Sequence, residues 1–86
     1  MPTISAFFGI AIRMYYDDHP TPHFHVQYGG DSALVNIETL EVIKGRIPRR
    51  ALMLVVEWAL EHRPELRANW VLAAQHEPLK PIEPLA

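Results

Sequence analysis

The chain has 86 residues and a net charge of −2, and 49% of its residues are hydrophobic. This length predicts one domain over residues 1–86, and the low charge excludes the long-range attraction to nucleic acid that a strongly basic domain has. The chain contains no cysteine, which excludes disulfides and thiolate metal sites and fits a reducing compartment. The N-terminal apolar run is short and contains Arg13, so it is not typical of a signal peptide or a membrane span. We therefore expect a cytoplasmic protein.

Segments of the N-terminal half alternate apolar and polar residues with the period of two that is typical of half-buried strands. This pattern predicts strands over residues 8–16, 23–28 and 32–38. Aspartate and proline in residues 17–22 predict a loop, and Gly29-Gly30 predicts a hairpin turn. A short fourth strand around residues 42–43, ended by Gly45, would complete an antiparallel sheet of three to four strands.

After Pro48 the apolar residues recur at the spacings of three and four that are typical of amphipathic helices. We predict one helix over residues 48–62 and, because proline is poorly tolerated inside a helix, a second that starts at Pro64 and spans 64–76. Both helices would pack on one face of the sheet, with Trp58 and Trp70 at the contact. The predicted fold class is therefore α+β.

The last ten residues carry prolines at every third position, with aliphatic residues in step with them. Three residues per turn is the repeat of polyproline II, in which these aliphatic side chains would share one face. We predict an extended, proline-rich C-terminal tail that docks on the domain through this face.

The histidine motif is the richest source of candidate chemistry. His23 and His25 lie two apart on a predicted strand, so both imidazoles lie on one face, roughly 6.5–7 Å apart along the chain. Three interpretations stay open: a divalent metal such as zinc bound by His19, His23 and His25, an acid–base pair for metal-free phosphodiester cleavage, or histidines that only line a solvated face.

Arg13 and Tyr15 are predicted on the polar face of the first strand. If the first two strands pair, the Arg13 guanidinium could reach the two histidines, and an arginine beside two imidazoles suits an anionic ligand. An ion pair between Arg13 and Glu38 across the sheet is the alternative. Tyr15 could offer a ring for stacking or serve only the packing of the strand.

Four basic residues fall within seven positions, namely Lys44, Arg46, Arg49 and Arg50. Positive side chains at a helix start oppose the helix dipole, and no serine, threonine, aspartate or asparagine precedes Pro48 as a cap. A bound anion would relieve both faults, which makes this basic segment a candidate binding site. A solvated cluster of outward-turned arginines is the alternative.

Several short runs resemble a family of very small bacterial proteins known only as a domain of unknown function, part of which is named as DhiT-type toxins. The runs are Pro2-Thr3-Ile4-Ser5, Phe8-Gly9-Ile10, Asp18-His19, Pro22-His23-Phe24-His25-Val26, Arg50-Ala51-Leu52, Glu57-Trp58, Glu65-Leu66 and Asn69-Trp70. The resemblance covers essentially the whole chain. It implies a type II toxin–antitoxin pair, with a DhiA-type antitoxin of similar size from an adjacent gene as partner. The histidine motif carries over onto His19, His23 and His25, and the basic helix start onto Arg49 and Arg50.

The sequence therefore suggests a toxin-like protein that acts on RNA through a sheet face carrying Arg13, His23 and His25 and a basic rim from Lys44 to Arg50. The alternative is a binding module that holds a metal, a small anion or a protein partner on the same face without breaking a bond. The low net charge favours the alternative, because a ribonuclease gains affinity from many phosphate contacts. The clustered histidines and the basic helix start favour the first.

Overall fold

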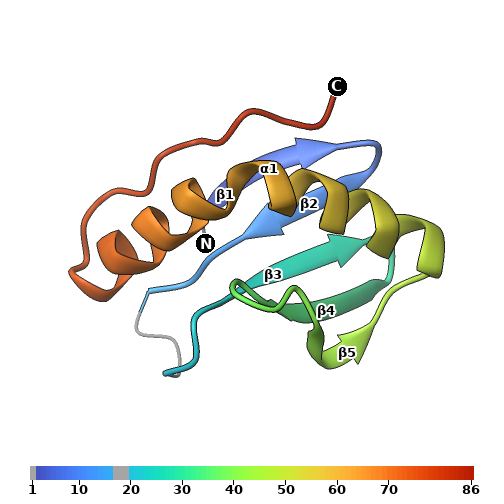
Figure 1. The fold of residues 1–86 in the computed structure, drawn as a ribbon, viewed down its shortest axis with the longest axis horizontal. Helices are drawn as coiled ribbons and strands as arrows, with labels where there is room; N and C mark the ends of the chain where they lie inside the picture. The colour runs from blue at the N-terminus through green and yellow to red at the C-terminus, as the bar shows by residue number, and fades with distance from the viewer. Residues whose placement is uncertain (1, 17–19) are drawn as a thin grey trace.

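The computed structural model describes residues 2–16 and 20–86. Within these residues, five strands form one antiparallel sheet in chain order, and one helix crosses one face of it (Figure 1). The elements are β1 (Thr3–Phe7), β2 (Ile10–Arg13), β3 (His23–Tyr28), β4 (Asp31–Asn36), β5 (Val42–Arg46) and α1 (Arg49–Ala74). The predicted architecture of three to four strands and two helices is therefore wrong in both numbers.

The first predicted strand, over 8–16, is in fact part of a hairpin. Phe8 and Gly9 both have positive φ, 48° and 79°, and form the turn between β1 and β2. Positive φ at both central residues matches the turn that joins twisted antiparallel strands. The prediction missed β1 because alternation runs on through the turn and phenylalanine is an unusual residue at positive φ.

The strand predicted over 23–28 is confirmed as β3, whereas β4 ends at Asn36 rather than at residue 38. Asn36 Oδ1 accepts hydrogen bonds from the amides of Glu38 and Thr39, at 2.7 and 3.0 Å, and this turns the chain. Gly45 does not end the last strand but lies inside β5. Its φ is 83°, and a Cβ there would lie 2.3 Å from the Ser32 carbonyl oxygen, so glycine allows the close approach of β4 and β5.

The helices predicted over 48–62 and 64–76 are one helix of 26 residues with a kink. Pro48 is the N-cap, Pro64 lies inside the helix, and His62 has the non-helical angles φ −120° and ψ 18°. Proline removes one backbone hydrogen bond, so a kink is the expected response. The helix continues because both halves bury residues in the same core, Trp58 before the kink and Leu66 after it. No helix in the described part of the chain is long and apolar enough to cross a membrane.

The core lies between the sheet and α1, with Trp58 at its centre. The Trp58 ring is fully buried, and its centroid lies 5.5 Å from that of Phe7 and 6.0 Å from that of Phe24. Trp70 also lies at the helix–sheet contact, as predicted. It is only partly buried, and it packs on His23 of β3.

The proline-rich tail runs along α1 and beside β1 (Figure 1). The Ile82 amide donates to the Ile4 carbonyl at 2.7 Å, and Trp58 Nε1–H donates to the Glu83 carbonyl at 2.8 Å. Asn69 holds Lys80 by two bonds of 2.9 Å, one to the Lys80 carbonyl and one from its amide. Ile82 is buried, so the tail completes the core at the β1 edge.

Candidate functional site

One face of the sheet is covered by α1, and the opposite face carries the candidate site. A row of paired positions crosses four strands, in which Arg13 lies opposite His25, His25 opposite Leu34, and Leu34 opposite Lys44. Neighbouring side chains along a strand point to opposite faces, and the neighbours Ile12, Val26 and Val35 are buried in the core. We call this second surface the open face; its residues are Ala11, Arg13, Tyr15, His25, Gln27, Ser32, Leu34, Lys44 and Arg46.

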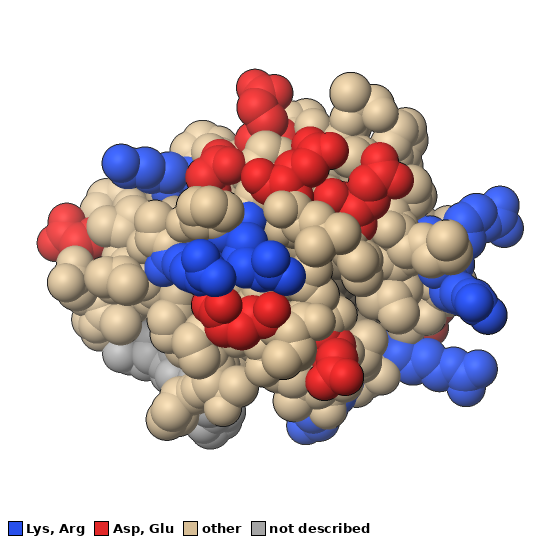
Figure 2. Space-filling model, in the orientation of Figure 1, with Lys and Arg blue, Asp and Glu red and all other residues tan. Residues whose placement is uncertain are grey.

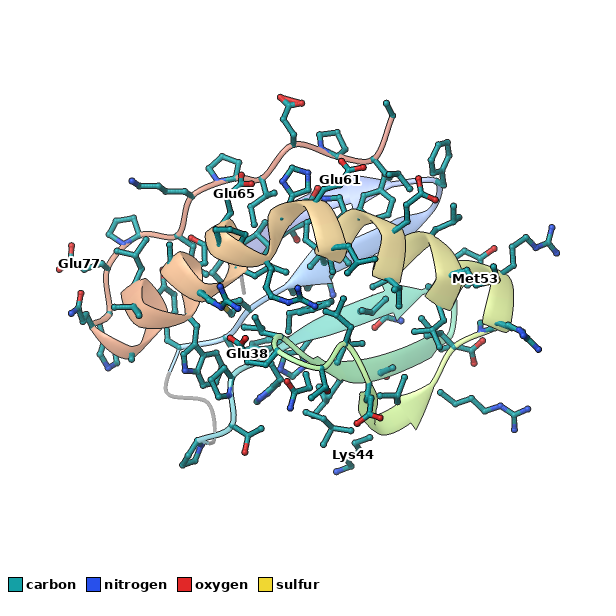
Figure 3. All side chains as sticks on the ribbon, viewed as in Figure 1. Glu38, Lys44, Met53, Glu61, Glu65 and Glu77 are labelled. Carbon is teal, nitrogen blue, oxygen red and sulfur yellow. The ribbon has the colours of Figure 1, made fainter. Side chains whose placement is uncertain are left out.

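Among the described residues named for the open face, the charged side chains all have the same sign. They are Arg13, Lys44 and Arg46. A shallow groove of about 280 Å³ lies on this face beside Lys44, lined by His25, Ser32, Ala33, Leu34, Lys44 and Gly45. Lys44 extends outward from β5 at the edge of the sheet (Figure 3). The groove therefore combines an imidazole with a lysine in a local positive field, on a domain whose net charge is negative.

Four aromatic and imidazole rings lie in sequence at one end of the open face. Ring centroids are 4.2 Å apart for Tyr15 and His25, 5.3 Å for His25 and His23, and 5.2 Å for His23 and Trp70. His25 is partly exposed, whereas His23 is only 4% exposed. The predicted pairing of the two histidines is thus present, with His25 toward solvent and His23 behind it.

His23 is held in place by the loop before β3. Its Nδ1 lies 2.7 Å from the Thr21 carbonyl oxygen, so Nδ1–H donates this bond and Nε2 is the basic nitrogen of the neutral ring. Thr21 has a φ of 69°, which is rare for a β-branched residue. Local strain of this kind persists only where the surrounding structure fixes it. The loop and Trp70 therefore determine the orientation of the His23 ring from two sides.

Arg13 lies beside His25 and does not pair with Glu38. Its Nε donates to Thr3 Oγ1 at 3.3 Å. Glu38 instead accepts two hydrogen bonds of 2.7 Å from Arg67 of α1, and the pKa of Glu38 is lowered chiefly by this bond. The predicted alternative of an Arg13–Glu38 ion pair is therefore wrong, and the Arg13 guanidinium belongs to the open face.

The basic segment is divided between two surfaces. Lys44 and Arg46 lie on the open face, whereas Arg49 and Arg50 lie at the start of α1. Arg49 lines a groove with Met53, and Arg50 lines another with Phe8 and Tyr28. Figure 2 shows cationic side chains gathered at the end of the molecule where β5 meets α1. The four basic residues therefore do not line one groove, and of the four only Lys44 lines the groove that contains His25.

The predicted metal site rests on three histidines, of which His19 lies outside the described residues. Within residues 2–16 and 20–86, no three histidine, cysteine, aspartate or glutamate side chains are grouped so that they could hold a metal ion. His23 and His25 together supply two imidazoles, and zinc sites use three or four protein ligands. These two rings alone do not make a zinc site.

Trp70 is the site residue that the sequence did not reveal. Its position in the helix pattern predicts a core residue, and only the crossing of α1 over the start of β3 brings it to His23. Tyr16 and His76 extend the same end of the molecule, because their rings are stacked with centroids 6.1 Å apart. No signal in the local sequence joins these pairs, since they are separated by 47 and 60 positions.

Comparison with known proteins gives a family for the fold and the site just described. No curated protein and no solved structure matches the chain. A family model matches residues 9–71, which cover β2 to β5, the histidine motif and most of α1. The match spans more than half of the chain, and the chain therefore belongs to the family described as Domain of unknown function (DUF4160).

Proposed function

We propose that the chain is a toxin-like component of a type II toxin–antitoxin pair, related to DhiT-type toxins, which acts on RNA in the cytoplasm through the open face. The observation that carries the proposal is the cross-strand row of Arg13, His25 and Lys44, with the groove beside it. The resemblance stated for the sequence supplies the toxin–antitoxin part, including a DhiA-type antitoxin from an adjacent gene as partner.

RNA suits the chemistry of the open face. Arginine and lysine bind phosphate, and Arg13, Lys44 and Arg46 form a local cationic surface on an otherwise acidic chain. Single-stranded RNA also presents unstacked bases, for which the partly exposed Tyr15 ring at the end of the row offers a stacking partner. Because three cationic side chains of the described residues contribute, we expect binding with a shallow dependence on salt.

Cleavage would use the two imidazoles. His25 is the partly exposed ring and takes the proton of the attacking 2′-hydroxyl, while the Arg13 guanidinium opposite it stabilises the charge that develops on phosphorus. His23, 5.3 Å away between ring centroids, is the second ionisable group and returns a proton to the leaving oxygen. This pair forms a 2′,3′-cyclic phosphate and a free 5′-hydroxyl.

The test is to induce the gene alone and together with its neighbour, while growth and RNA integrity are followed. Induction alone should stop growth, and co-expression should restore it. His25→Ala and Arg13→Ala should each lower RNA cleavage by roughly 10²–10⁴-fold without loss of the fold. Lys80→Ala is the matched control, because Lys80 is an exposed cation on the tail, which Asn69 holds on α1. If both open-face variants remain as active as Lys80→Ala, the open face is not the site of the activity.

A binding module without chemistry is the second candidate, and the burial of His23 favours it. An imidazole that is 4% exposed and packed on Trp70 reaches a substrate poorly. In this version the open face binds RNA, a small anion or the antitoxin, and His25→Ala weakens binding while no RNA is cut. Adding a chelator to the same assay tests the predicted zinc site. A chelator abolishes a zinc-dependent activity and leaves acid–base cleavage unchanged.

A further inference from the structure

The outward side of α1 carries an apolar groove on the side of the helix away from the sheet. Its lining residues are Arg49, Leu52, Met53, Val56, Glu57 and Leu60. Met53 is 63% exposed and Leu60 58% exposed, so large hydrophobic side chains face solvent here. Figure 3 shows Met53 projecting from the first half of α1, away from the sheet. Adjacent exposed hydrophobic residues of this kind mark an interaction surface.

The charges in this groove are arranged symmetrically about Met53. Arg49, Met53 and Glu57 follow one another at a spacing of four, so they form one row along the helix, with a cation at one end and an anion at the other. Leu52, Val56 and Leu60 form a second row with the same spacing. Figure 2 shows basic side chains gathered at the β5–α1 end, where α1 begins with Arg49, and a second basic group beside the middle of the helix.

A surface with this arrangement is complementary to itself. A two-fold axis that passes through Met53 at right angles to α1 makes the two helices antiparallel. It places Met53 against Met53 of the second copy and Arg49 against Glu57 of the second copy, and the same ion pair occurs twice. A uniformly acidic partner would face Glu57, and a uniformly basic one would face Arg49, so either would meet a like charge.

We propose that the occupant of this groove is a second copy of the chain, and that the protein forms a two-fold symmetric dimer through antiparallel α1 helices centred on Met53. The open face lies on the other side of the sheet, so the dimer leaves both open faces accessible. This proposal does not depend on the proposed function, because it rests on a different surface and is tested by the molecular mass of the protein in solution.

Charge reversal tests the proposal by sedimentation equilibrium. The wild-type chain should have twice the mass of the 9.9 kDa monomer at micromolar concentration. Arg49→Glu should shift it to monomer, and so should Glu57→Arg, whereas the combined variant restores the ion pair with reversed sign and should return the dimer. Val71→Glu is the control, because Val71 is a 52% exposed residue of α1 outside the groove, and its variant should remain dimeric.

A cross-link tests the position of the axis. The chain has no cysteine, so Met53→Cys introduces one thiol at the proposed centre. Mild oxidation should convert this variant to a disulfide-linked dimer, while Val71→Cys should stay monomeric on a denaturing gel. A monomeric wild-type chain, or equal cross-linking of the two variants, would overturn the proposal. So would protection of the Met53→Cys thiol only when the product of the neighbouring gene is added, because the groove would then belong to that protein.

Discussion

The two faces of the sheet are built from the same strands but differ in every physical respect. The covered face consists of fully buried apolar residues such as Ile12, Phe24 and Val35, packed on Trp58. The open face consists of partly exposed polar residues such as Arg13 and His25. Along these strands, residues that stabilise the fold therefore alternate with residues of the proposed RNA site. A substitution on the covered face should lower the stability of the fold, and one on the open face should lower RNA binding or cleavage.

The largest expected effect is on the covered face. Trp58→Ala should lower the free energy of unfolding by about 3–5 kcal/mol, because it leaves a cavity beside Phe7 and Phe24 and removes the hydrogen bond to the tail. His25→Ala, on the open face, should lower it by about 1 kcal/mol or less. Urea unfolding of both variants measures the difference. Equal losses would show that the two faces are not separated in this way.

This alternation is also what the sequence predicts best. The period of two identifies β3 and assigns Arg13, Tyr15, His23 and His25 to one side of the sheet, because side-chain direction in a strand depends only on position. Depth does not follow from alternation, so the burial of His23 under Trp70 was not predictable. The place of Arg49 and Arg50 off the open face likewise follows from where α1 begins.

The errors in the predicted fold have local causes. Phe8-Gly9 forms a turn without a recognisable turn residue at its first position, so the predicted strand 8–16 began inside the turn and β1 was missed. Pro64 suggested a helix boundary, and the packing of Trp58 and Leu66 in one core overrides that local preference. At Pro64, tertiary packing therefore outweighs the local preference of proline for a helix start.

A smaller loss of stability is expected where the C-terminal tail packs on α1. Asn69 is 1% exposed, and its two hydrogen bonds to Lys80 fix the tail on α1. Asn69→Ala should cost about 1–3 kcal/mol of stability, the net value of two such bonds. Hydrogen exchange at the Ile82 amide, which donates to the Ile4 carbonyl, should accelerate. Thr3→Ala, which removes the acceptor of Arg13 on the open side, is the control and should leave that exchange rate unchanged.

The smallest expected effect on stability concerns the ion pair between Glu38, in the turn after β4, and Arg67 of α1. The hydrogen bond from Arg67 lowers the pKa of Glu38, with Coulombic attraction to Arg67 and Arg63 acting in the same direction. A carboxyl whose pKa is lower in the folded state stabilises the fold above its unfolded pKa, which is about 4.3 for a free glutamate. This contribution is lost as the pH falls through the lowered value.

Arg67→Gln should therefore unfold slightly more easily than the wild type at pH 7, and the difference should vanish in acid, where both chains carry a protonated Glu38. The effect is small because both side chains are about half exposed and solvent screens the pair. An NMR titration gives the direct measurement, since the Glu38 carboxyl should titrate lower in the wild type than in Arg67→Gln. Arg13→Gln should leave the titration of Glu38 where the wild type has it, because Arg13 lies on the open face. A rise in the Glu38 pKa in Arg13→Gln would mean that the two faces are electrostatically coupled, and the separation between them would then hold for packing alone.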